Sequence, residues 1–143
     1  MKTTLMAAGL AFTAIFAAAP AFAEMQKFKG DLKAASEVPA NDSKASGSVE
    51  ATYDTVTKKL TYAVAYKDLS GPATAAHFHG PAAAGANAGV VVPWSSSMSS
   101  PMEGSATLTA GQVADLMAGR WYANVHTAAH PGGEVRGQMT VRN

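Results

Sequence analysis

Apolar and polar residues alternate with a period of two along most of the chain. The clearest run is KLTYAVAYKDL at 59–69, where Leu60, Tyr62, Val64 and Tyr66 share one face. Such alternation is typical of a β-strand with one buried face. Similar runs, separated by clusters of Gly, Pro, Asn, Asp and Ser, predict further strands at 27–34, 46–54, 74–79, 89–94, 104–109, 120–127 and 134–141. The pattern therefore predicts an antiparallel β domain.

One segment, 109–118, departs from this alternation and predicts a short helix. Thr109 can cap its first turn, and Gln112 three residues later completes a capping box. The apolar stripe of the helix is formed by Val113, Leu116 and Met117. We expect this helix to connect two strands and to carry no chemistry.

The last two predicted strands are joined by the segment AAHPGG, whose turn-forming residues predict a β-hairpin. In this hairpin the polar residues of both strands have the same parity, so they share one outward face. The pairs that this register predicts are His126 with Glu134, Asn124 with Arg136, and Tyr122 with Gln138.

The N-terminal residues 1–23 have the features of a secretory signal peptide. Lys2 precedes a long apolar run, and the segment ends in AFA, a small-x-small cleavage pattern. An uncleaved membrane anchor is the alternative, but the apolar run is short for a span. We therefore expect a single mature domain over 24–143, located in the periplasm or secreted, with no membrane span after cleavage.

The expected mature domain is neutral and contains no cysteine. Residues 1–23 hold one of the 11 basic residues and none of the 10 acidic ones, which leaves a formal net charge of 0. A neutral domain provides no electrostatic field for nucleic acid or anionic lipid. The lack of cysteine fits a bacterial exported protein, and any metal would need His, Met, carboxylate or backbone ligands.

All four histidines of the chain lie at the ends of predicted strands, beside two loops rich in Gly and Pro. His77 and His79 stand two residues apart, so both project from the same side of their strand, while Phe78 points into the core. This spacing can bring two imidazoles to one Zn²⁺ or Cu²⁺ ion. Two ligands alone are a weak signal, and a pair of solvated histidines is the alternative.

His126 and His130 flank the second of these loops. If both loops lie at one end of the domain, the four imidazoles converge, and Glu134 can join them as a ligand or as an orienting carboxylate. The candidate metal residues are His77, His79, His126, His130 and Glu134. The residues expected to orient these ligands or to clamp the loop are Tyr122, Asn124 and Arg136. A structural ion pair between Glu134 and Arg136 that fixes the loop is the alternative role for those two residues.

Four segments carry a resemblance to a known family: LKAASEVPAND, AHFHGPA, AGVVVPW and AGRWYANVHTAAHPGGEVRGQM. They resemble the CHRD domain, named after the animal protein chordin, and the resemblance extends from Leu32 to Met139. It implies an all-β, immunoglobulin-like or Greek-key sandwich or barrel. The implied motif positions are His77, His79, Gly80, Pro81, Asn124, His126, Thr127, Gly133, Glu134, Arg136 and Gly137. The family has no generally established activity, so the resemblance does not assign one here.

Three functions are compatible with these observations. The first is an exported module that binds copper or zinc through the histidines, with an affinity that falls below about pH 6 as the imidazoles protonate. The second is a non-catalytic recognition or structural module in which the histidines are hydrogen-bonded scaffolding. The third is a copper enzyme, by a looser analogy with the copper–zinc superoxide dismutase barrel. We find no catalytic motif and expect no enzyme.

Geometry separates the first two functions. Ring nitrogens of His77, His79 and His126 within about 5 Å of one another favour the metal-binding module. Hydrogen bonds from His77 and His79 to backbone carbonyls of 127–133 favour the scaffold.

Overall fold

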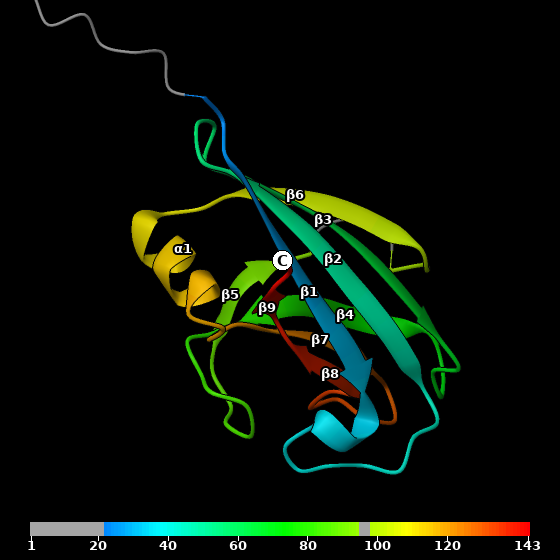
Figure 1. The fold of residues 1–143 in the computed structure, drawn as a ribbon. Coiled ribbons are helices and arrows are strands. Elements are labelled where there is room, and N and C mark those ends of the chain that lie inside the picture. Colours follow the sequence, from blue (N-terminus) through cyan, green and yellow to red (C-terminus); the bar gives the residue numbers. More distant parts are fainter. Residues whose placement is uncertain (1–21, 95–97) are drawn as a thin grey trace, which may run out of the picture.

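An antiparallel β-sheet that curls into a nearly closed barrel, with one α-helix beside it, forms the molecule (Figure 1). The computed structural model describes residues 22–94 and 98–143. The predicted signal peptide therefore lies, up to residue 21, outside the described residues. The strands are β1 (Met25–Lys33), β2 (Ser46–Asp54), β3 (Lys59–Lys67), β4 (Ala73–His79), β5 (Val90–Pro93), β6 (Met102–Thr107), β7 (Tyr122–Thr127), β8 (Val135–Gln138) and β9 (Thr140–Val141).

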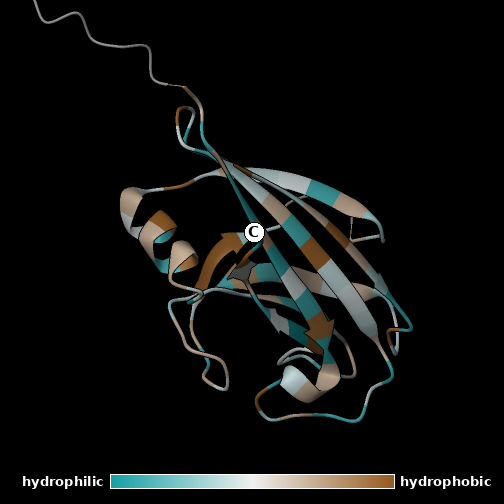
Figure 2. Cartoon of the chain, in the orientation of Figure 1, coloured by the Kyte–Doolittle hydropathy of each residue, from teal (hydrophilic) through white to brown (hydrophobic). Residues whose placement is uncertain are grey.

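Strict alternation builds the most regular part of this sheet. β1, β2 and β3 pair in antiparallel register along their length, and their inward residues are apolar. Figure 2 shows hydrophilic and hydrophobic residues succeeding one another along these strands. The predicted antiparallel β architecture is confirmed, because each strand pair described in the structure is antiparallel.

The strand order is β5-β4-β7-β8-β1-β2-β3-β6, and β9 also pairs with β1. β1 thus joins the hairpin strands at the end of the chain to the long strands at its beginning. The predicted strand over 134–141 is corrected here, because it breaks at Met139, whose N–H donates to the carbonyl of Trp121. Val141 lies beyond this break and is 38% exposed.

The predicted helix is confirmed as α1 (Ala110–Met117), with a 3₁₀ turn, η1 (Ala34–Ser36), elsewhere in the chain. Thr109 caps α1 through its side chain, and Gln112 returns a hydrogen bond to the Thr109 backbone. Leu116 is the residue that α1 buries. No helix in the described part of the chain has the length and apolar character needed to cross a bilayer.

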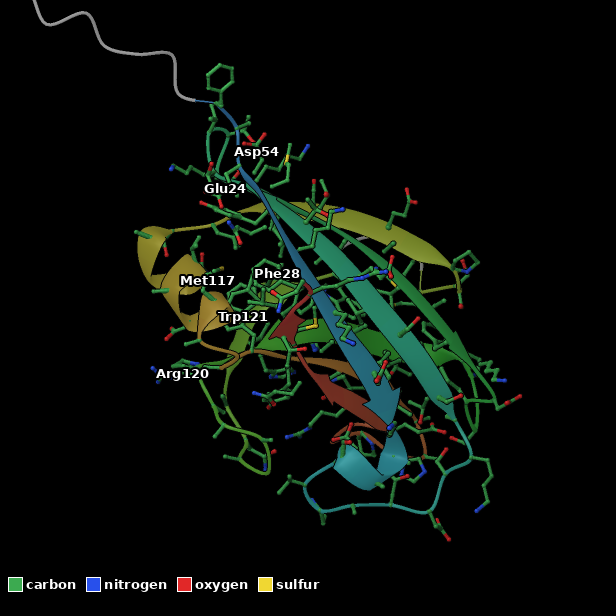
Figure 3. All side chains as sticks on the ribbon, viewed as in Figure 1. Glu24, Phe28, Asp54, Met117, Arg120 and Trp121 are labelled. Carbon is green, nitrogen blue, oxygen red and sulfur yellow. The ribbon has the colours of Figure 1, made fainter. Side chains whose placement is uncertain are left out.

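The interior of the barrel is an apolar core with an aromatic centre. Phe78 packs against Trp94 and Trp121 with ring centroids 5.1 and 5.8 Å apart. Figure 3 shows Phe28 and Trp121 within the barrel, where both are buried. The side chain of Arg120, the residue before Trp121, projects outward. Because neighbouring residues on a strand face opposite sides, burial of Phe78 directs the flanking histidines to the outer side of β4.

Candidate metal centre

Three histidines meet on the outer face of the adjacent strands β4 and β7. His77 and His79 come from β4, and His126 comes from β7, where it pairs with Ala75. One ring nitrogen from each imidazole lies within 4.8 Å of the others. This satisfies the geometric criterion for a shared metal ion. We refer to His77, His79 and His126 as the histidine triad.

Backbone carbonyls fix the orientation of two rings in the histidine triad. His79 Nδ1 lies 3.0 Å from the carbonyl oxygen of Ala88, and His126 Nδ1 lies 3.0 Å from that of Pro131. A carbonyl oxygen only accepts hydrogen bonds, so each Nδ1 carries the proton and each Nε2 of the neutral ring carries a lone pair. Histidines that bind metals commonly donate their second ring N–H in this way.

The Nε2 lone pair of His79 is the unusual feature of the triad. This atom is buried, and it has no hydrogen-bond partner among the described residues. A buried acceptor without a partner destabilises a fold by about 1–3 kcal/mol and calls for an explanation. A metal ion bound at this atom would supply the missing partner.

The spacing of the other two rings fits coordination as well. His77 Nδ1 lies 3.3 Å from His126 Nε2. Two nitrogens bound at about 2.0–2.1 Å to one tetrahedral ion lie about 3.3–3.4 Å apart. The same contact forms a hydrogen bond when His77 Nδ1 carries the ring proton, whereas the tautomer of His77 with its proton on Nε2 makes both lone pairs available to an ion.

All three imidazoles are held in their neutral form at neutral pH. Burial lowers the pKa of each ring, and the neighbouring imidazoles of the triad lower the pKa of His77 further. The guanidinium of Arg136 also lowers the pKa values of His79 and His126. Neutral rings are the form that binds metals, so the environment prepares the triad for ligation.

An aromatic stack supports one side of the triad. The ring of Tyr122 lies parallel to that of His79, with an interplanar angle of 2° and centroids 4.8 Å apart. The guanidinium carbon of Arg136 lies 4.1 Å from the centroid of the Tyr122 ring. Tyr122 lies on β7, between β4, which carries His79, and β8, which carries Arg136. The side chains of these three residues therefore stack in layers across the three strands.

The predicted polar face of the hairpin is covered by other parts of the chain, so it is not open to solvent. Tyr122, Asn124 and Arg136 are all buried. Loop residues cover them: Arg136 donates to the carbonyl of Ala86 and to the side chain of Asn87. The predicted register of this hairpin is confirmed for Asn124 with Arg136 and for Tyr122 with Gln138.

Glu37 is the buried partner that the sequence pattern did not reveal. Its carboxylate accepts hydrogen bonds from Arg136 Nε at 3.1 Å and from the side-chain amide of Asn124. Burial raises the pKa of Glu37, and the charge of Arg136 opposes this shift. Gly133 makes room for the arrangement, because a Cβ there would lie 2.7 Å from a Glu37 oxygen. The segment EVP of the CHRD resemblance was the one signal that pointed to this residue.

Glu134 faces away from the triad, so its predicted place beside His126 is corrected. Its carboxylate accepts hydrogen bonds from the hydroxyls of Ser43, Ser70 and Thr127 and from the backbone N–H of Ser70, at 2.6–2.8 Å. Burial alone would raise the pKa of Glu134, but these bonds outweigh it and lower the pKa from 4.5 to about 2. Arg136 bonds to Glu37 instead, so the predicted Glu134–Arg136 pair does not form.

His130, the fourth histidine, also lies apart from the triad. It sits on the loop after β7, beside a cavity of about 240 Å³ lined by residues of that loop and of 37–41. Its backbone closes the loop by exchanging hydrogen bonds with Thr127. The structure thus brings together three of the four predicted histidines.

Comparison with known proteins identifies one family. The model of the CHRD domain matches residues 28–139, which include every residue of the triad and its buried supports. Neither a curated protein nor a solved structure matches the chain significantly.

Proposed function

This chain belongs to the CHRD domain family, and we propose that it binds a transition metal, copper or zinc, through His77, His79 and His126. The observation that carries the proposal is the convergence of three imidazole nitrogens within 4.8 Å. The buried Nε2 of His79, which has no hydrogen-bond partner among the described residues, supports it. Nitrogen ligands of this type suit both metals in an environment that offers no thiolate.

The hydrogen bonds of the triad favour metal binding over a scaffold role. In a scaffold, His77 and His79 would donate to carbonyls of 127–133, whereas His79 bonds to Ala88 in the other loop. The His126 bond to Pro131 leaves its second nitrogen free to face His77. Each bond therefore keeps the ring proton on Nδ1 and leaves the Nε2 lone pair available to a ligand.

Metal titration of the purified protein tests this function. After treatment with a chelator, the protein is titrated with Cu²⁺ and with Zn²⁺, and the binding is compared in His126→Ala and His130→Ala. We expect one tight equivalent that is lost in His126→Ala and retained in His130→Ala, since His130 lies outside the triad. Equal loss in the two variants, or no stoichiometric binding at all, would overturn the proposal.

We also propose that the chain is exported and acts as a binding protein rather than as an enzyme. The support is the sequence of residues 1–23, with its basic start, apolar run and AFA cleavage pattern. Expression in a bacterium followed by mass spectrometry of the periplasmic fraction tests the export. We expect a mature N-terminus at Glu24, and an intact Met1 in the cytoplasmic fraction alone would refute it.

A further inference from the structure

We propose that the metal held by the histidine triad keeps a coordination position on the Ala75 side that takes an exchangeable small anion. This inference rests on the metal binding proposed above and extends it to the class of ligand. Three observations support it: the number of donors, their exposure, and the charges around them.

The number of protein donors is too small to complete a coordination sphere. Among the described residues, the triad gathers three imidazoles and no carboxylate. Glu134 and Glu37 are engaged by other partners in the interior. Zinc and copper sites in proteins hold at least four ligands as a rule, and sites with three protein ligands take the next from solution.

The residues beside the triad leave room for such a ligand. Ala75 pairs with His126 and precedes His77 on the same face of β4, so at this position the described strands β4 and β7 place only a methyl group beside the two imidazoles. On the other side of β4, Pro93 pairs with His77 and Val90 pairs with His79. These side chains have no donor atoms, and Val90 is 50% exposed. His77 and His126 are themselves partly exposed, so a small solute reaches them from solvent.

The charges around the triad favour an anion over a neutral ligand. A divalent ion bound by three neutral imidazoles keeps its full charge. The charged groups that act on the triad are its own imidazoles and Arg136, all of them positive when charged. Among the described residues no carboxylate joins the triad to compensate the ion, and charge is poorly screened in such a half-buried site. An anion from solution supplies the compensation, and water fills the position in its absence.

Azide is a suitable probe because it is small, anionic and spectroscopically active when bound to Cu²⁺. The copper-loaded protein is titrated with azide at pH 7, while the near-ultraviolet charge-transfer band and the electron paramagnetic resonance spectrum are recorded. Gel filtration after the titration measures the copper that remains bound. We expect a saturable response with one azide for each copper ion and no loss of copper.

Ala75→Asp tests where the position lies. The new carboxylate would stand beside His126 and His77, so it should occupy the open position and weaken azide binding by at least about tenfold, with copper retained. Thr74→Asp is the matched control, because it adds the same charge at the adjacent position, which is exposed near the start of β4 and does not share the face of His77. We expect its azide response to equal that of the unmodified protein.

The outcomes separate this inference from the proposed function. Stoichiometric copper binding without an azide response overturns the open position and leaves the metal site standing. An azide response of equal strength in Ala75→Asp and Thr74→Asp also overturns the inference. Failure to bind copper overturns both proposals together.

Discussion

Two polar clusters lie close together in the barrel, and they differ in how completely their atoms are partnered. In the Glu134 cluster, one carboxylate accepts hydrogen bonds from Ser43, Ser70 and Thr127. In the histidine triad, the buried Nε2 of His79 has no partner among the described residues. Both clusters involve β7, since Thr127 and His126 are neighbours that face opposite sides.

This difference indicates which cluster stabilises the fold and which is available for a ligand. A buried carboxylate with every acceptor position used fastens the segments that donate to it, here 43, 70 and 127. A cluster with unused lone pairs gains its missing interaction from outside. We therefore expect substitutions in the Glu134 cluster to affect stability, and substitutions in the triad to affect metal affinity.

The largest effect is expected for Glu134→Ala. This change leaves three hydroxyls and a backbone N–H without their acceptor, so we expect the free energy of unfolding to fall by about 3–4 kcal/mol. Denaturant unfolding measures the loss. Glu103→Ala, at an exposed position of β6, is the control and should change stability by less than about 0.5 kcal/mol. A similar small change in Glu134→Ala would contradict the structural role of this cluster.

Lowering the pH should affect the two clusters at different pH values, first the metal affinity of the triad and then the stability contributed by Glu134. The pKa of Glu134 is lowered from 4.5 to about 2 in the fold, so the stability it contributes is fully present above about pH 5 and is lost as the pH falls toward 2. The shift corresponds to about 3 kcal/mol. Unfolding curves from pH 6 to pH 2 measure it, and Glu134→Gln should flatten the dependence.

Metal release should occur at a higher pH than this loss of stability. Protons compete with the ion for the imidazole lone pairs, so we expect affinity to weaken below about pH 6 while the protein stays folded. Metal retained at pH 4 by the folded protein would show that the imidazoles do not supply the essential ligands.

A pair of substitutions should produce opposite phenotypes. His77→Ala removes one triad nitrogen from a partly exposed side chain, so we expect metal affinity to fall by about 100-fold and the stability of the metal-free protein to change by less than about 1 kcal/mol. Ser70→Ala should lower stability by about 1–2 kcal/mol and leave metal affinity unchanged. Calorimetric titration and denaturant unfolding of both variants test this, and parallel losses in either measurement would remove the distinction.

The smallest effect is expected for Tyr122→Phe. This variant tests whether the hydroxyl of Tyr122, at the edge of the triad, contributes to stability or to metal affinity. The Tyr122 hydroxyl bonds to the backbone N–H and carbonyl of Ala88, the same carbonyl that accepts from His79. The variant keeps the ring stack and loses these bonds, so we expect a loss of about 1 kcal/mol in stability and less than tenfold in metal affinity. A larger loss of affinity would mean that the loop at Ala88 controls the site more strongly than the stack does.

Much of the secondary structure, and the placement of two of the three triad histidines, could be predicted from local sequence patterns. The bounds of β2 and the capping box of α1 agree with the sequence prediction, because a period of two and a helix cap depend on residues a few positions apart. The placement of His77 and His79 on one side of β4 follows from the same period. The sequence by itself also excluded thiolate ligands, since the chain contains no cysteine.

Long-range packing decided the rest. The triad forms because β4 and β7 are neighbours in the sheet, and no local pattern encodes that order. Glu37 meets Arg136 across 99 positions of sequence, and Glu134 turns toward Ser43 and Ser70 because the hairpin register ends before it. Periodicity fixes the side of a strand on which a residue lies. Which polar atoms then find partners, and which lone pair is left for a ligand, depends on how distant loops close over that side.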